Sequence, residues 1–229
     1  MTEKKTIVIG DIHGNILGIQ DLITKVKPSK EDELIFLGDY VDGLRYSYET
    51  VEYLIELSKR HSCVFLMGNH DEWHIDFLKN YPRMGVSQQF NGGQYTRASY
   101  IKNLINLNEK EIQKKISVHL EFFNKLKYYH YDDKNKYIYV HAGLINGHLS
   151  DHNSVFTWDR ELIQYANTYK ELPEILHKYK KIFIGHTGTS FYGSSEPIII
   201  DNLICMDTDG GWYGKISAMN VHTNEFWQS

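Results

Sequence analysis

Short apolar runs that end beside glycine and a polar side chain recur along this chain of 229 residues. The first run, residues 7–9, leads directly into Gly10-Asp11-Ile12-His13-Gly14. A short apolar run bounded by glycine predicts a buried strand that ends in a tight turn. The polar residues that follow this run and four later ones are Asp11, His13, Asp39, Asn69, His141 and His186. Side chains that follow parallel strands meet at one edge of a sheet, so this pattern strongly limits the possible folds.

Alternating strand and helix patterns predict an α/β fold with right-handed crossovers. Strands are expected at residues 6–9, 34–37, 63–67, 137–140 and 182–184. Asn15 is expected to cap a helix over residues 16–26, and Ser47 to cap a second helix. The inward positions of that second helix are expected to be Val51, Leu54, Ile55 and Ser58. The C-terminal segment predicts an antiparallel meander of strands at residues 197–200, 203–206 and 215–221.

Residues 72–130 interrupt this alternation and have a mostly helical pattern, with a loop around residues 82–93. We expect this segment to be a helical insertion that covers the site at the sheet edge. No change of composition and no Pro-, Gly- or Ser-rich linker marks a boundary, so residues 1–229 are expected to form a single domain.

Composition excludes several broad classes of protein. The formal net charge of −4 argues against general nucleic-acid binding. No segment approaches the roughly 20 continuous apolar residues of a membrane span, so no membrane association is expected. Cys63 and Cys205 both lie inside apolar runs, which predicts buried, reduced thiols and fits a reducing cytoplasm.

The polar residues at the strand ends supply oxygen and nitrogen ligands that suit borderline divalent metals. They are too many for one zinc ion, and they suit two metal ions. A carboxylate must bridge two neighbouring dications to reduce their repulsion, and Asp39 is expected to do so. Asp11 and His13 would complete the first site, and the ligands of the second would be Asn69, His141 and His186.

A known family carries the same motifs in the same order. They are Gly10-Asp11-Ile12-His13-Gly14, Gly38-Asp39-Tyr40-Val41-Asp42, Gly68-Asn69-His70-Asp71, His141-Ala142-Gly143 and Gly185-His186-Thr187. This set resembles the phosphoprotein phosphatase branch of the calcineurin-like metallophosphoesterases, of the small bacterial and phage type. The resemblance implies a four-layer α/β/β/α sandwich with a dinuclear metal site at the carboxyl ends of the strands. It also implies phosphoester hydrolysis with two divalent ions, Mn²⁺ first and Fe or Zn as alternatives.

The resemblance also implies catalytic roles. A metal-activated hydroxide would attack phosphorus, and His70 would protonate the leaving oxygen as general acid. Asp42 would hold the His70 imidazole, although an aspartate before glycine is also a common turn residue. Arg160, in Trp158-Asp159-Arg160, matches a phosphate-binding arginine of bacterial members, and its alternative role is a surface ion pair.

Two segments depart from the family pattern or extend it. The family usually has arginine directly after the second-motif aspartate, whereas this chain has Gly43 there and Arg45 two residues later. Arg45 is therefore either a displaced phosphate clamp or an exposed residue. Asn91, in Asn91-Gly92-Gly93, belongs to an element also found in small bacterial members. Its paired glycines suit either the approach of a ligand to the backbone or an ordinary turn.

Three functions follow from these residues. The leading interpretation is a serine/threonine protein phosphatase that acts on a phosphorylated protein or peptide. The alternative is a dinucleoside tetraphosphate pyrophosphohydrolase, with a nucleotide substrate. A non-catalytic, metal-binding regulatory module is the third, and the presence of both Asp42 and His70 argues against it.

Overall fold

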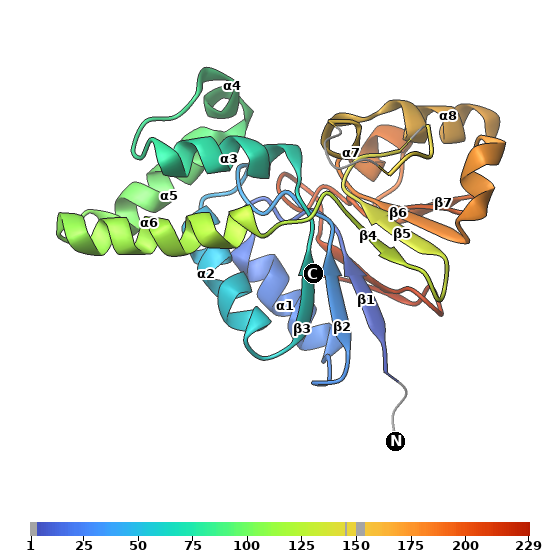
Figure 1. The fold of residues 1–229 in the computed structure, drawn as a ribbon, viewed down its shortest axis with the longest axis horizontal. Coiled ribbons are helices and arrows are strands. Elements are labelled where there is room, and N and C mark those ends of the chain that lie inside the picture. Colours follow the sequence, from blue (N-terminus) through green and yellow to red (C-terminus); the bar gives the residue numbers. More distant parts are fainter. Residues whose placement is uncertain (1–3, 145, 150–153) are drawn as a thin grey trace.

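The computed structural model describes residues 4–144, 146–149 and 154–229 and contains two five-stranded sheets (Figure 1). The first sheet has the order β10-β9-β1-β2-β3. β1, β2 and β3 are parallel, and β9 and β10 continue the sheet antiparallel. Its strands are β1 (Thr6–Ile9), β2 (Glu33–Phe36), β3 (Ser62–Phe65), β9 (Ser217–Asn220) and β10 (Phe226–Gln228).

The second sheet has the order β4-β5-β6-β8-β7, with β5, β6 and β8 parallel and both edge strands antiparallel. Its strands are β4 (Tyr129–Asp132), β5 (Tyr137–Val140), β6 (Lys181–Ile184), β7 (Ile198–Ile200) and β8 (Leu203–Cys205). The carboxyl ends of β5 and β6 point to the same side of the molecule as those of β1 and β2, where the polar motifs lie (Figure 1).

Each central strand is apolar on both faces because both faces are covered. Val8 and Ile35 pack between the sheets with Tyr139 and Phe183, whereas Ile7 and Ile9 face the helices outside. Those helices are α1 (Ile16–Val26) and α2 (Ser47–Ser58) on the first sheet, and α7 (Val155–Trp158), α8 (Glu161–Tyr169) and η2 (Glu174–Lys178) on the second. A third apolar cluster joins α8 to the second sheet, so the predicted α/β/β/α sandwich is confirmed.

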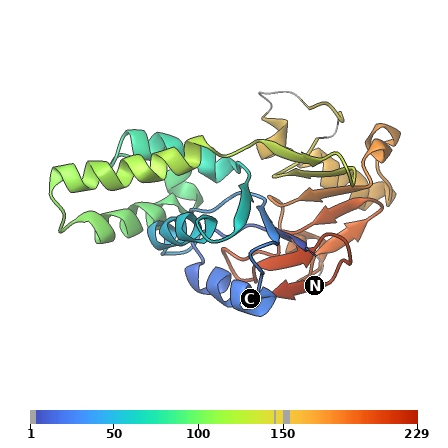
Figure 2. The same cartoon turned by 60° about the horizontal axis from the view of Figure 1, so that its bottom comes forward.

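The expected helical insertion is confirmed as an arm that projects beyond both sheets (Figure 2). It contains α3 (Asn69–Lys79), α4 (Val86–Gln88), η1 (Gln89–Gly93), α5 (Gln94–Leu104) and α6 (Glu109–Asn124). Asn108 caps α6 by accepting from the Glu111 amide, while the Glu111 carboxylate accepts from the Asn108 amide. No helix within the described part of the chain is both long enough and apolar enough to cross a membrane.

Two details of α2 differ from the prediction. Ser47 is the first residue of the helix and makes no capping hydrogen bond; its Oγ lies 2.8 Å from Thr96 Oγ1. Ser58 is exposed, and Leu57 takes the inward position instead. The helix therefore begins one residue before a Ser47 cap would allow, and the Ser47 hydroxyl contacts the helical arm instead.

Strand pairing was only partly predictable. The prediction of a C-terminal meander was wrong, because β8 pairs in parallel with β6, and of the three expected strands only β7 and β8 pair with each other. β9 crosses to the other sheet and pairs with β1. β4 and β10 were not expected, and β4 begins at Tyr129, inside the range assigned to the insertion. Turn residues locate strands, but the choice of partner depends on tertiary contacts.

Candidate active site

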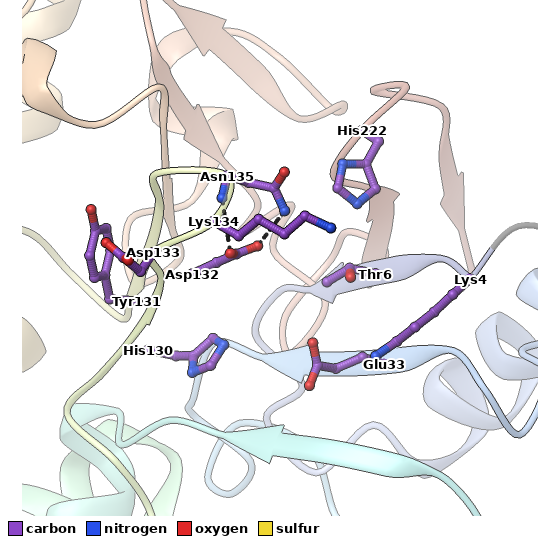
Figure 3. Close-up of a pocket in the computed structure, with 10 residues that line it drawn as sticks. All are labelled: Lys4, Thr6, Glu33, His130, Tyr131, Asp132, Asp133, Lys134, Asn135 and His222. Carbon is purple, nitrogen blue, oxygen red and sulfur yellow. Dashed lines mark hydrogen bonds between the residues drawn. The ribbon is translucent and has the colours of Figure 1, made fainter.

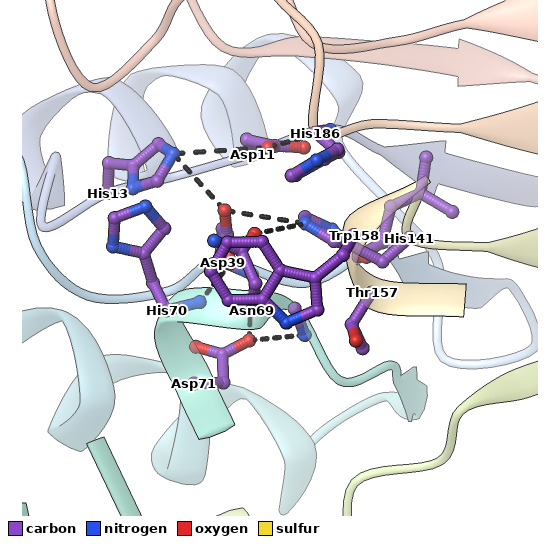
Figure 4. Close-up of polar contacts among 12 residues, drawn as sticks. Asp11, His13, Asp39, Asn69, His70, Asp71, His141, Thr157, Trp158 and His186 are labelled. Carbon is purple, nitrogen blue, oxygen red and sulfur yellow. Dashed lines mark hydrogen bonds and ion pairs between the residues drawn. The ribbon is translucent and has the colours of Figure 1, made fainter. Parts of the chain in front are cut away.

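The predicted metal ligands converge at the junction of the two sheets (Figure 4). Turns after β1 and β2 supply Asp11, His13 and Asp39, and the turns after β5 and β6 supply His141 and His186. Asn69 is the first residue of α3, directly after the turn that follows β3. All are buried. His13, Asp39 and His186 have positive φ values of 50°, 54° and 65°, a conformation that costs free energy in residues other than glycine and clusters at functional sites.

Hydrogen bonds to backbone carbonyls fix the tautomers of two imidazoles. His13 Nδ1 lies 2.9 Å from Val41 O, and His141 Nδ1 lies 2.9 Å from Leu37 O. A carbonyl only accepts, so each Nδ1 carries the proton and each Nε2 of the neutral ring presents a lone pair. These two Nε2 atoms lie 3.5 and 3.4 Å from the same atom, Asp39 Oδ2. Acceptors that face one another in this way fit cations placed between them.

Unpartnered atoms and crowded carboxylates around Asp39 also fit bound cations. Asp11 Oδ1 and His186 Nε2 are buried without a hydrogen-bond partner. Burial, Asp207 and Asp39 together raise the pKa of Asp11 well above its usual range. Burial also raises the pKa of Asp207 to about 7. Divalent cations would relieve this repulsion and satisfy the free lone pairs.

Two groups of donor atoms share Asp39, and within each group the atoms lie within 4.8 Å of one another. One contains Asp39, His141 and His186, and the other contains His13, Asp39 and His70. Asn69 Oδ1 lies 3.2 Å from His141 Nε2, next to the first group. Asp11 Oδ2 lies 3.9 Å from His13 Nε2 and adjoins the second group.

The carboxylate of Asp71 holds the turn that carries Asp39. Its Oδ2 accepts from the amides of Asp39 at 2.7 Å and Gly68 at 2.9 Å, and its Oδ1 accepts from the Tyr40 amide at 2.9 Å. Asp71 thereby joins the loops after β2 and β3, which carry Asp39 and Asn69.

His70 and Asp42 form a buried pair next to this centre. His70 Nδ1 donates to Asp42 Oδ2 at 2.8 Å, and the His70 amide donates to Asp39 Oδ1 at 3.0 Å. Burial alone would lower the pKa of His70, but the carboxylates of Asp39 and Asp42 raise it to about 9. With Nδ1 bound to Asp42, Nε2 is the ring nitrogen left for another partner.

The other predicted site residues divide into two groups. Arg160 and Asn91 line the same cavity as His13 and His70, and Arg160 Nη1 donates to Thr187 Oγ1 at 3.0 Å. Arg45 is exposed, lies over the Tyr95 ring at 5.6 Å and is not among the residues that line the cavity.

The unusual glycine of the second motif has a steric cause. Gly43 has φ +86°, and an added Cβ would lie 3.0 Å from Gly211 O and from His13 Cβ. Gly92 also packs against it, since a Cβ on Gly92 would lie 2.3 Å from Gly43 N. The Asn91-Gly92-Gly93 element and Gly43 therefore fit one another, and an arginine at position 43 would be strained here.

The cavity has a volume of about 490 Å³ and contains residues that the sequence analysis did not assign to the site. Three of them are aromatic, namely Phe191, Trp212 and Tyr213, and two are the carboxylates of Asp207 and Asp209. The Trp212 ring lies 5.9 Å from the His13 ring. The sequence signal for Trp212 and Tyr213 was their place directly after Gly210-Gly211.

A second cavity of about 680 Å³ lies at the other end of the strands, beside Thr6, Glu33, Asp132 and His222 (Figure 3). Within the described residues, neither group of clustered metal-type donors includes a residue of this cavity. The chemistry therefore centres on Asp39.

Two stacked sheets that bring two donor groups together around one shared carboxylate define a candidate two-metal hydrolase. A family model for calcineurin-like phosphoesterases matches residues 4–209. The chain belongs to this family, and the predicted family and the hydrolase class are confirmed.

Solved structures with the same fold have little sequence identity to this chain. A candidate diadenosine tetraphosphatase has a TM-score of 0.65 and 18% identity, covering 100% of this chain and 94% of its own. A cold-active protein-tyrosine phosphatase of a Shewanella species has a TM-score of 0.65 and 18% identity, covering 98% and 80%. A serine/threonine phosphatase from Saccharomyces cerevisiae has a TM-score of 0.57 and 14% identity, covering 99% and 79%.

Proposed function

We propose that this chain hydrolyses phosphate esters with two divalent cations that share Asp39. The observation that carries the proposal is the position of Asp39 Oδ2, which faces the lone pairs of His13 and His141. Asp11 and His13 would hold one cation, and the ligands of the other would be Asn69, His141 and His186. Mn²⁺ is the proposed ion, with Fe or Zn as alternatives. When bound, such cations make a water nucleophilic at neutral pH and orient the phosphate.

The side chains around the cations would complete the reaction. His70 is proposed to give a proton to the leaving oxygen from Nε2, while Asp42 holds Nδ1 and fixes the ring. Arg160 lines the cavity and is proposed to bind phosphate oxygens with its planar guanidinium. Its bond to Thr187 orients the group.

We propose phosphoserine or phosphothreonine in a peptide as the substrate. Among the described residues that line the cavity, Arg160 is the one lysine or arginine, whereas Asp207 and Asp209 are acidic. One guanidinium and two cations suit the charge of a single phosphate group. A longer polyphosphate would place further negative charge near the two aspartates.

The free thiols of Cys63 and Cys205 are the basis for proposing a reducing cytoplasm as the location of the protein.

A dinucleoside tetraphosphate is the second candidate substrate, and the aromatic lining favours it. Phe191, Trp212 and Tyr213 are 78%, 47% and 103% exposed, and all three line the cavity. Exposed aromatic rings can stack on nucleobases. The structure named as a candidate diadenosine tetraphosphatase also shares the fold.

The proposal is tested by assaying the manganese-loaded protein on a phosphothreonine peptide and on diadenosine tetraphosphate. Hydrolysis of the peptide alone would support the first substrate. Hydrolysis of the dinucleotide alone would replace it by the second. No hydrolysis of either substrate with Mn²⁺, Fe²⁺ or Zn²⁺ would contradict both.

A variant separates the two substrates further. If the dinucleotide stacks on the aromatic lining, Trp212→Ala raises its KM by about 10-fold or more and leaves the peptide KM unchanged. Phe90→Ala is the control, because Phe90 is 79% exposed and does not line the cavity.

A further inference from the structure

The Asp42 carboxylate is held from both sides, and one side belongs to the helical arm. Oδ2 accepts from His70, whereas Oδ1 accepts from Thr96 Oγ1 at 2.7 Å and from Gln88 Nε2 at 3.2 Å. Thr96 lies on α5 and Gln88 on α4, more than 40 residues along the chain from Asp42. Asp42 and Thr96 are 0% exposed and Gln88 is 2% exposed, so solvent competes little for these bonds.

The Thr96 hydroxyl uses its full hydrogen-bonding capacity at this point. It donates to Asp42 Oδ1 and accepts from the Asp42 amide at 2.9 Å. Because its only proton goes to the carboxylate, the Ser47 hydroxyl must be the donor in their 2.8 Å contact. Thr96 therefore binds both the backbone and the side chain of Asp42, which restricts the Asp42 side chain to one orientation.

The backbone of the arm rests on the same loop. Gly92 packs so closely on Gly43 that an added Cβ would lie 2.3 Å from Gly43 N. The arm therefore contacts the Asp42-Gly43 loop through close backbone packing and through side-chain hydrogen bonds.

We infer that Thr96, assisted by Gln88, is a positioning residue that aligns the His70 imidazole through Asp42. This inference rests on the proposed function, in which His70 protonates the leaving oxygen. None of these bonds joins Thr96 to a proposed metal ligand. Loss of the Thr96 hydroxyl would therefore impair proton donation by His70 while metal binding persists. The helical arm would then contribute to the chemistry in addition to lining the cavity through Asn91.

Two substrates with different leaving groups can distinguish a positioning role of Thr96 from a general loss of protein stability. p-Nitrophenolate is a stable anion and leaves without needing a proton, whereas the alkoxide of serine needs one. Thr96→Val, assayed as the manganese-loaded full chain, should lower kcat on a phosphoserine peptide by about 10- to 100-fold. Its kcat on p-nitrophenyl phosphate should fall less than about 3-fold, with KM and bound manganese unchanged. Thr96→Ser keeps the hydroxyl and should restore the peptide activity.

Ser99→Ala is the matched control, because Ser99 is a buried hydroxyl residue of the same helix that bonds Tyr48 and Glu49 and not Asp42. It should show no difference between the two substrates. If Thr96→Val does not fold, Gln88→Leu is tested instead. It should also lower kcat more on the peptide than on p-nitrophenyl phosphate, by a smaller factor than Thr96→Val. Equal losses on both substrates would overturn the positioning role. If the wild-type protein hydrolyses no phosphate ester, the proposed function itself fails.

Discussion

Hydrogen bonds fix three of the four polar atoms of Asp39. Its amide donates to Asp71 Oδ2, and its carbonyl accepts from the amides of Ile12 at 3.1 Å and His13 at 2.8 Å. Oδ1 accepts from the His70 amide, which leaves Oδ2 for the centre. Burial opposes a charge here, but His141, His70 and His13 hold the pKa of Asp39 well below its usual range. Asp39 is therefore an ionised carboxylate with a preset direction, as a bridging ligand must be.

Two substitutions at this site should have different consequences. Asp39→Asn should lose bound manganese and activity together, because one oxygen of the proposed bridge would become an amide donor. His70→Asn should keep the metal but lose about 100-fold or more in kcat on an alkyl phosphate. Metal analysis of the purified variants and the phosphatase rate measure both effects. An active Asp39→Asn variant with two bound ions would contradict bridging, and an unchanged rate in His70→Asn would contradict proton donation.

At the scale of elements, the close fit of η1 on the loop after β2 can be tested with glycine variants. Gly92→Ala would force a Cβ against Gly43 N from a residue with φ +90°. We expect it to lower the free energy of unfolding by about 1–3 kcal/mol and to lower phosphatase activity. Gly85→Ala is the control, since its Cβ would meet nothing within 4 Å. Equal urea midpoints for the two variants would show that the contact at Gly92 is unimportant.

A chain of polar groups, buried except for the partly exposed Glu52, joins α3, α5 and α6 of the arm to α2. Glu52 accepts from His119 Nε2 at 3.2 Å, so His119 Nδ1 accepts from the Tyr100 hydroxyl at 2.7 Å. The hydroxyl oxygen in turn accepts from His74 Nε2 at 2.9 Å. The bond from His119 is the main cause that lowers the pKa of Glu52 to about 2. His74 Nδ1 is left buried without a partner, so a proton there would be unsatisfied.

His74 should therefore make the stability of the protein dependent on pH. Burial, with His119, lowers the pKa of His74 well below its usual 6.5 in the folded state. The contribution of neutral His74 to the free energy of unfolding is complete above the unfolded-state pKa of about 6.5. As pH falls below that value, the free energy of unfolding decreases by about 1.4 kcal/mol per pH unit. His74→Phe should remove this part of the slope in urea unfolding between pH 7.5 and 5.5. His148→Gln, at an exposed position, serves as control. An unchanged slope in His74→Phe would contradict this assignment.

The parts of this architecture that depend on local sequence were predictable. The apolar runs before Asp11, Asp39, His141 and His186 identify central strands, because a strand covered on both faces must be apolar throughout. The roles of Thr96 and Gln88 were not predictable, since they arise from the docking of a helix onto a distant loop. Arg45 lies two residues after position 43, where the family usually has arginine. Its side chain nevertheless lies over the Tyr95 ring and is not part of the cavity lining. Sequence proximity did not place it in the site.

At the scale of the whole molecule, the candidate centre spans the contact between the two sheets. Asp11, His13 and Asp39 belong to loops of the first sheet, and His141 and His186 belong to loops of the second. The sheets also share an apolar contact, in which Val8 and Ile35 of the first sheet pack with Tyr139 and Phe183 of the second. Cations bound by ligands from both sheets would cross-link them beyond this apolar contact.

Manganese should consequently raise the melting temperature of the protein. A ligand at 100 times its Kd stabilises the folded state by about 2.7 kcal/mol, which corresponds to roughly 5–10 °C for a chain of this size. Thermal unfolding of chelator-treated protein, with and without added Mn²⁺, measures this shift. Asp39→Asn should lose most of it, whereas Asp21→Asn, which alters an exposed ion pair with Lys25, should keep it. Tight binding to the folded state alone must raise its stability, so two bound manganese ions with an unchanged melting temperature would contradict a site that only the folded pair of sheets forms.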